Sequence, residues 1–142
     1  MYLQEKIAKE NSDITNMKLQ KLCYYAQGFT LALTGKPLFN ERIEAWAYGP
    51  VVPELYSKYS DYVSNVIPYK NIDPTENFNE DELEILNETY HVYGDYSALK
   101  LSRLSHSEPT WINHYHINSN DHKEEIPQEE MEIFFKTLVE YE

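Results

Sequence analysis

The sequence predicts a mainly α-helical fold: a compact multi-helix single domain with a small β element after its long second helix. Apolar residues recur at helical spacing in several segments, and helix-capping residues stand at the ends of these segments. In only one short stretch do two kinds of side chain alternate with the period of two that is typical of a β-strand. The chain of 142 residues has the length of one domain and shows no repeat or linker, so we expect residues 1–142 to form a single domain.

The N-terminal part of the chain contains the most regular helical pattern. We expect a short helix over residues 1–10. A long helix follows, with Thr15 or Asn16 as its N-cap, and it reaches about Thr34, where Gly35 is the stop signal. Its apolar stripe is wide, which predicts that this helix is central to the core. The stripe comprises Leu19, Leu22, Cys23, Ala26, Thr30 and Leu33, flanked by Met17, Tyr25 and Phe29.

The period of two falls on residues 42–48, which predicts one short strand, paired with residues near Leu38 and Phe39. The smaller side chains of this strand should face the core, which leaves its aromatic side chains on a more exposed face. The core face carries Ile43, Ala45 and Ala47, and the other face carries Glu44, Trp46 and Tyr48.

A helix and a loop follow the strand. Pro53 fits the first position of a helix that runs to about Tyr62, and residues 64–79 form a loop. The inward face of this helix carries Leu55, Tyr56 and Tyr59.

The second half of the chain contains three more helices and one short helical turn. Asn79 and Glu82 resemble a capping box that opens a helix, and Gly94 ends it. Residues 97–106 form the next helix, a short turn follows it, and Pro127 opens a C-terminal helix. The inward residues are Leu83, Leu86, Tyr90 and Tyr93 in the first, Leu99, Leu101 and Leu104 in the second, and Met131, Phe134, Phe135, Leu138 and Val139 in the last.

The net charge of −12 is unevenly placed. Residues 1–60 carry six acids and seven bases, which gives +1, whereas residues 61–142 carry eighteen acids and five bases, which gives −13. This balance argues against binding to nucleic acid, which needs Lys and Arg to displace counterions from phosphates, and against binding to anionic membranes. A basic protein partner fits the sign of the charge.

The cysteine content and the apolar segments indicate a cytoplasmic protein. The single cysteine, Cys23, has no partner for an internal disulfide, and the chain begins without the apolar segment of a signal peptide. No apolar stretch approaches the length of a membrane span.

The sequence contains no set of residues typical of an enzyme or a metal site. His114 and His116 stand two apart, and neither they nor the other histidines match the spacing of zinc ligands. Cys23 falls in the apolar stripe of the long helix, where a thiol behaves as a small hydrophobic group with a raised pKa. Pairs of acidic residues stand in the first turns of predicted helices, where they interact favourably with the helix dipole. We therefore predict no catalytic residue, no metal, no cofactor and no enzymatic activity.

The stretch EAWAYGPVVPELY, from Glu44 to Tyr56, places two aromatic side chains, Trp46 and Tyr48, before a stiff bend at residues 49–53. A residue before a proline is pushed out of the helical conformation, and prolines reduce the entropy of the unfolded loop. Two interpretations are open. The bend is either a buried corner between a strand and a helix or a rigid aromatic surface that contacts a partner.

A series of short motifs in a fixed order provides a further indication. They are Lys18-Leu19-Gln20-Lys21-Leu22, Tyr25-Ala26-Gln27-Gly28, Gly35-Lys36-Pro37-Leu38-Phe39, Glu44-Ala45-Trp46, Gly49-Pro50-Val51-Val52-Pro53 and Tyr56. The later stretch LSHSEPTW adds Leu104, His106 and Trp111. Together these motifs resemble the Panacea domain, also called the SocA-like antitoxin domain.

The resemblance implies a mostly helical single domain that acts as an antitoxin in a bacterial or prophage toxin–antitoxin system and neutralises a cognate toxin protein by direct binding. We favour a contact role for the aromatic bend, with two lysines on the polar face of the long helix beside it. The predicted partner-binding residues are Lys18, Lys21, Trp46, Tyr48, Gly49, Pro50, Val51, Pro53, Tyr56, His106 and Trp111.

Two other functions stay open. The charge of −13 on residues 61–142 suits an acidic inhibitor or nucleic-acid mimic made by a mobile element. Some SocA-like relatives are proteolytic adaptors that deliver a toxin to a Clp-type protease, so the resemblance also implies that alternative. The sequence leaves the identity of the toxin and the formation of a homodimer open.

Overall fold

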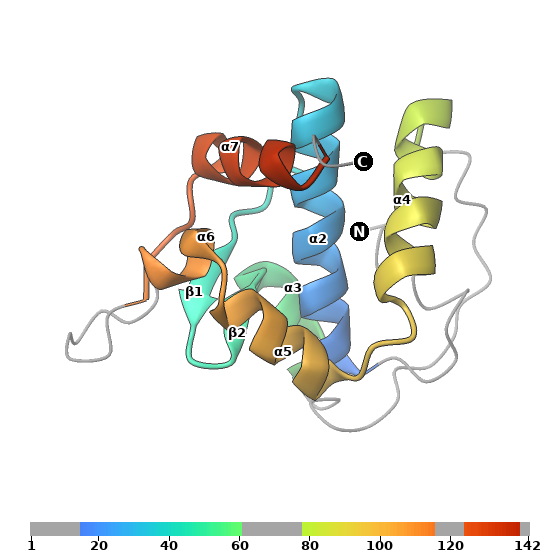
Figure 1. Ribbon diagram of the computed structural model, residues 1–142. Coiled ribbons are helices and arrows are strands. Elements are labelled where there is room, and N and C mark those ends of the chain that lie inside the picture. Colours follow the sequence, from blue (N-terminus) through green and yellow to red (C-terminus); the bar gives the residue numbers. More distant parts are fainter. Residues whose placement is uncertain (1–14, 61–77, 116–123, 140–142) are drawn as a thin grey trace.

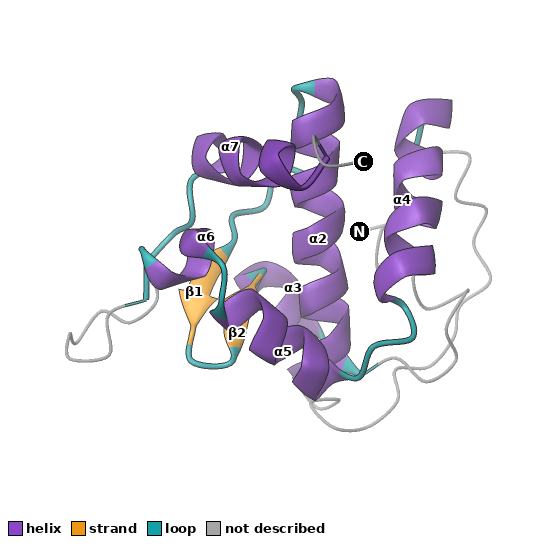
Figure 2. Ribbon diagram, viewed as in Figure 1, coloured by secondary structure: helices purple, strands orange, loops and turns teal. Residues whose placement is uncertain are grey.

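The computed structural model describes residues 15–60, 78–115 and 124–139, which Figure 1 draws as coloured ribbons. This described part is mainly α-helical with one two-stranded antiparallel sheet, as the sequence predicts (Figure 2). The helix expected over residues 1–10 lies outside it. The elements are α2 (Asn16–Thr34), β1 (Glu44–Trp46), β2 (Gly49–Val51), α3 (Pro53–Lys58), α4 (Glu80–Tyr93), α5 (Ala98–His106), α6 (Pro109–Ile112) and α7 (Gln128–Val139).

Helix α2 is the central element, which confirms the prediction. Its N-cap is Thr15, whose hydroxyl accepts a hydrogen bond of 3.3 Å from the backbone N–H of Lys18. Its C-cap is Gly35, with a φ of 75° that favours glycine. Helices α4, α5 and α7 and strand β2 all pack against α2, and in Figure 1 α7 crosses it while α4 lies alongside.

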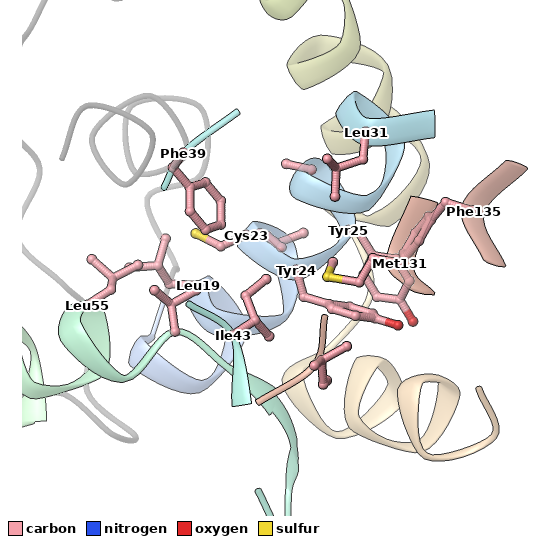
Figure 3. Packing of buried hydrophobic residues seen from close by; sticks show 14 of the residues in the cluster. Leu19, Cys23, Tyr24, Tyr25, Leu31, Phe39, Ile43, Leu55, Met131 and Phe135 are labelled. Carbon is pink, nitrogen blue, oxygen red and sulfur yellow. The ribbon is translucent and has the colours of Figure 1, made fainter. Parts of the chain in front are cut away.

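Aromatic packing joins α7 to α2 (Figure 3). The ring of Phe135 makes edge-to-face contacts with Tyr24, Tyr25 and Phe29, at centroid separations of 5.4, 5.9 and 4.9 Å. Phe135 lies directly on Gly28, because a Cβ at that position would be 2.2 to 2.4 Å from three of its ring atoms. The missing side chain of Gly28 therefore sets the close approach of the two helices.

Three side chains that were expected to face the core are exposed. Leu33 is 53% exposed and Leu99 is 60% exposed, and Ala47 is exposed as well. Leu33 lies in the last turn of α2, beside a groove between α2 and α4. Leu99 points away from the buried face of α5, which Leu101 sets instead, and Ala47 stands in the turn beyond the end of β1.

The pairing of the predicted strand differs from the one expected. Strand β1 pairs with β2 in an antiparallel hairpin, in which Ala45 lies opposite Pro50. Leu38 and Phe39 are held instead by Gln27 of α2, whose side-chain oxygen accepts from the backbone N–H groups of both. Because Pro50 has no N–H to donate to a ladder, the sequence Gly-Pro-Val does not resemble a strand.

The remaining helices begin and end close to the expected positions. Asn79 forms the predicted capping box with Glu82 at the start of α4, and Ser97 caps α5. Helices α6 and α7 also form where they were expected. Helix α3 ends at Lys58, before the expected end at Tyr62, which lies outside the described residues.

Candidate functional site

The proline-rich bend after the hairpin is buried. Residues 49–53 are all buried, and Val52 has no exposed surface. The backbone N–H of Val52 donates to the side-chain oxygen of Gln20 at 2.8 Å, and the carbonyl oxygen of Pro50 accepts from the amine of Lys21 at 3.2 Å. Of the two interpretations of the bend, the buried corner therefore describes these residues, and a contact role for them stays a prediction.

Polar side chains of α2 hold this corner. The amide nitrogen of Asn16 donates to the carbonyl oxygens of Tyr56 at 3.1 Å and Tyr59 at 2.9 Å. The amide oxygen of Asn16 accepts from Gln20 at 2.8 Å. A buried backbone group without a partner costs about 1–3 kcal/mol, so these bonds explain why polar residues stand on a buried helix face.

The second motif segment holds the other side of the hairpin. The carbonyl groups of residues 46–48 each accept a side-chain hydrogen bond from α5 or its C-terminal neighbour α6. The donors are Ser102 to residue 48 at 2.6 Å, His106 to residue 47 at 2.9 Å and Trp111 to residue 46 at 2.7 Å. A carbonyl oxygen only accepts, so His106 carries its proton on Nε2 in this bond. The two motif segments that are separate in sequence thus form one site.

Two aromatic side chains of the hairpin differ in exposure. Tyr48, in the turn, is 68% exposed. Trp46 is half-buried: its indole N–H donates to Glu44 at 3.0 Å, and its ring packs edge-to-face against Tyr56 with centroids 5.0 Å apart. Glu44 in turn accepts from Arg42 at 2.8 Å. We call Trp46, Tyr48 and Tyr56 the aromatic surface.

The two motif lysines are not on an exposed polar face, in contrast to the prediction. Lys18 is half-buried, and Lys21 is 1% exposed because β2 and α5 cover this side of α2. Burial lowers the pKa of Lys21 to about 7. Lys21 and the aromatic surface line the same pocket, which has a volume of about 90 Å³. The pocket is lined by Met17, Gln20, Lys21, Trp46, Tyr48, Val51 and Tyr56.

One buried acid of this region was missed in the sequence. Glu108, just before α6, accepts hydrogen bonds from the hydroxyl groups of Tyr24 at 2.8 Å and Tyr25 at 3.0 Å. Burial raises the pKa of Glu108 to about 7, although these hydrogen bonds act in the opposite direction. The sequence did contain a signal for this site. The acid stands inside the LSHSEPTW motif, and the two adjacent tyrosines of the central helix are possible hydrogen-bond donors to it.

The described residues hold no cluster of His, Cys, Asp and Glu side chains suited to a metal ion. Of the two histidines considered as ligands, His116 lies outside the described residues, and His114 hydrogen-bonds to Glu124 and Glu130. Cys23 is buried, and burial raises the pKa of its thiol. Among the helices of the described ranges, none combines the length and apolar character that crossing a membrane requires.

The sequence of this chain is similar to that of known antitoxins. Residues 19–112 match the sequence family described as antitoxin SocA-like, Panacea domain. The antitoxin SocA of Caulobacter vibrioides (strain NA1000 / CB15N) is 45% identical over 58 residues, which are 41% of this chain. The match spans 31% of the length of that relative. No solved structure matches the chain.

Proposed function

Because the chain belongs to the SocA-like antitoxin family with a Panacea domain, we propose that it neutralises a cognate toxin protein by binding to it directly. The family match over residues 19–112 includes the hairpin and both segments that hold it. On this proposal the protein acts in the cytoplasm of a bacterium. It needs neither catalysis nor a cofactor, and its partner is a protein rather than nucleic acid or a membrane.

The rigid, exposed tip of the hairpin is the observation that best supports a protein-binding role. Three side-chain hydrogen bonds fix the carbonyl groups of residues 46–48, while the ring of Tyr48 is exposed. A surface that is already ordered loses little conformational entropy when a partner binds. Tyrosine and tryptophan are also the side chains that most often dominate binding energy in protein interfaces.

Co-expression with the protein encoded by the neighbouring gene tests the proposal, because toxin and antitoxin genes are usually adjacent. We expect the neighbour to arrest growth alone, growth to resume when both proteins are made, and the two proteins to co-purify. A neighbour that is harmless alone, or that stays toxic beside this chain, contradicts the proposal.

An acidic inhibitor that imitates nucleic acid is the alternative favoured by the charge of residues 61–142. Three acids of α4, Asp81, Glu84 and Glu88, also line the groove between α2 and α4. Binding through such charges weakens steeply as salt is raised, whereas binding through the aromatic surface changes little. A salt titration of the purified complex separates the two modes.

A proteolytic adaptor is the other alternative, and it comes from the family alone. It would lower the level of the toxin through a Clp-type protease. The half-life of the partner, measured in cells with and without this chain, distinguishes the two modes. An unchanged half-life with growth restored supports sequestration.

A further inference from the structure

Lys21 is a buried cation without an acidic partner in the described part of the chain. It is 1% exposed, and its amine makes one hydrogen bond, to the carbonyl oxygen of Pro50 at 3.2 Å. An amine has three donor positions when protonated, so this bond leaves it incompletely satisfied. A methionine would fill the same space without the cost of burying an ammonium group. It would, however, leave the buried carbonyl oxygen of Pro50 without this donor, so the fold explains one donor position of the lysine and leaves the other two without a partner in the described residues.

Lys21 lines a pocket as well as packing in the core. Besides Lys21, the pocket of about 90 Å³ has no charged side chain in its lining, and the three residues of the aromatic surface belong to that lining. Gly49, with a φ of 116°, makes room for the amine, because a Cβ there would lie 2.8 Å from Cε of Lys21 and 2.8 Å from Oγ of Ser105. The hairpin is thus shaped around the lysine side chain.

The titratable side chains of β1, α3 and α5 that form hydrogen bonds form them with groups other than Lys21. On β1, Glu44 is bound to Arg42 and to the indole of Trp46, and on α3 Glu54 is bound to Arg42. On α5, His106 is bound to the carbonyl oxygen of Ala47. The other titratable groups of the lining are the hydroxyls of Tyr48 and Tyr56. An anion bound in the pocket would compensate the charge of Lys21.

We propose that this pocket receives an aspartate or glutamate side chain of the toxin, whose carboxylate forms an ion pair with Lys21 beside the aromatic surface. The proposal rests on the proposed function. The volume of about 90 Å³ is enough for a carboxylate group with its methylene. The rings of Trp46, Tyr48 and Tyr56 would exclude water from the ion pair, as the residues around a binding hot spot do.

The proposal predicts that binding is linked to uptake of a proton. Burial lowers the pKa of Lys21 to about 7, so the amine is largely neutral above that pH in the protein alone. A carboxylate beside it raises the pKa again. The complex then holds more protons than its separate parts in the window above pH 7, and the affinity must fall as the pH rises through that window.

Isothermal titration calorimetry of the full chain with the protein encoded by the neighbouring gene measures this linkage. The titrations are made at pH 7.0 and 8.5, in pairs of buffers with different ionisation enthalpies, below the range where tyrosines ordinarily ionise. We expect uptake of close to one proton at pH 8.5 and an affinity lower by about tenfold than at pH 7.0. Lys21→Met should weaken binding at pH 7.0 by about 100-fold and remove the uptake. Lys36→Met, at an exposed position just after the end of α2, is the matched control and should keep both the affinity and the proton uptake.

The outcomes separate this inference from the proposed function. Binding that is unaffected by Lys21→Met, with the same proton uptake, overturns the carboxylate pocket and leaves the antitoxin proposal standing. No association with either chain overturns both. A second measurement covers the case that the variant does not fold: in the wild-type chain with ¹³C-labelled lysine, the Cε resonance of Lys21 should titrate at a higher pH in the complex than alone. An unmoved titration overturns the inference.

Discussion

The indole N–H of Trp111 donates a hydrogen bond of 2.7 Å to the carbonyl oxygen of Trp46, 65 positions earlier in the chain. The two tryptophans belong to separate motifs, and this bond makes them parts of one structure. The ring of Trp111 stacks on Tyr115 and lies 4.3 Å from the ring of His106. Helix α6 therefore holds the end of β1, while Ser102 and His106 of α5 hold the turn that carries Tyr48.

Trp111→Phe tests this bond, because it keeps an aromatic ring and removes the donor. The partly buried carbonyl of Trp46 then loses its partner, and we expect the free energy of unfolding to fall by about 1–3 kcal/mol. Circular dichroism should show a lower Tm, and the hairpin amides should exchange hydrogen faster. Ser107→Ala is the control, since that hydroxyl, at the C-cap of α5, donates to the carbonyl oxygen of Leu104 and does not reach the hairpin. Wild-type exchange rates in Trp111→Phe would contradict the role of the bond.

Gly28→Ala should destabilise the protein although alanine is the better helix former. The new Cβ would meet the ring of Phe135 at 2.2 Å, and such overpacking costs about 1–3 kcal/mol. Urea denaturation measures the cost. Gly35→Ala is the control, because no atom lies within 4 Å of its new Cβ and the positive φ alone costs about 1–2 kcal/mol. When combined with Phe135→Leu, the effect of Gly28→Ala should shrink; strictly additive costs would argue against the clash.

Glu108→Gln should change how stability depends on pH. Burial raises the pKa of Glu108 to about 7, above its ordinary value of 4.5, so folding favours the protonated form. The stability from this proton is complete below about pH 4.5 and is lost as the pH rises through about 7. A neutral amide stays uncharged throughout, so we expect a higher Tm than wild type at pH 8 and a flatter profile between pH 4.5 and 7.

Thermal unfolding of both chains at several pH values provides this measurement. Glu84→Gln, at an exposed position of α4, is the control for a general change of charge. A Glu108→Gln chain that is less stable than wild type at pH 8 would mean that the carboxylate is ionised in its bonds to Tyr24 and Tyr25.

The parts of the fold that the sequence predicts correctly depend on local signals. Thr15 and Gly35 bound α2 because a side-chain cap and a positive φ act within one helical turn. The capping box of Asn79 and Glu82 is equally local. The hairpin escaped prediction because its second strand contains Pro50, which gives no alternating pattern and contributes no N–H.

The sequence predicts many of the residues of the candidate site but not how these residues are arranged in space. The motif residues Trp46, His106 and Trp111 do come together, but through bonds between side chains and backbone that no periodicity encodes. Lys21 and Glu108 are polar residue types that usually stand at the surface. Their burial depends on partners 29 and 83 to 84 positions away, which only the folded chain reveals.

The structure moves the clearest test of binding from Trp46 to Tyr48. Trp46 is half-buried and packs on Tyr56, so Trp46→Ala should lower the free energy of unfolding by about 1–2 kcal/mol as well as the affinity for the toxin. Such a mixed effect does not separate a contact residue from a structural one.

Tyr48→Ser should separate them. The side chain is 68% exposed, and the bond that holds this residue uses its backbone carbonyl, which serine keeps. We expect a change in the free energy of unfolding within about 0.5 kcal/mol. Binding to the toxin should weaken by about 2 kcal/mol, as for a central aromatic hot spot, measured by calorimetry. Val92→Ser, at an exposed position of α4, is the matched control and should change neither. Wild-type affinity in Tyr48→Ser would place the toxin on another face of the protein.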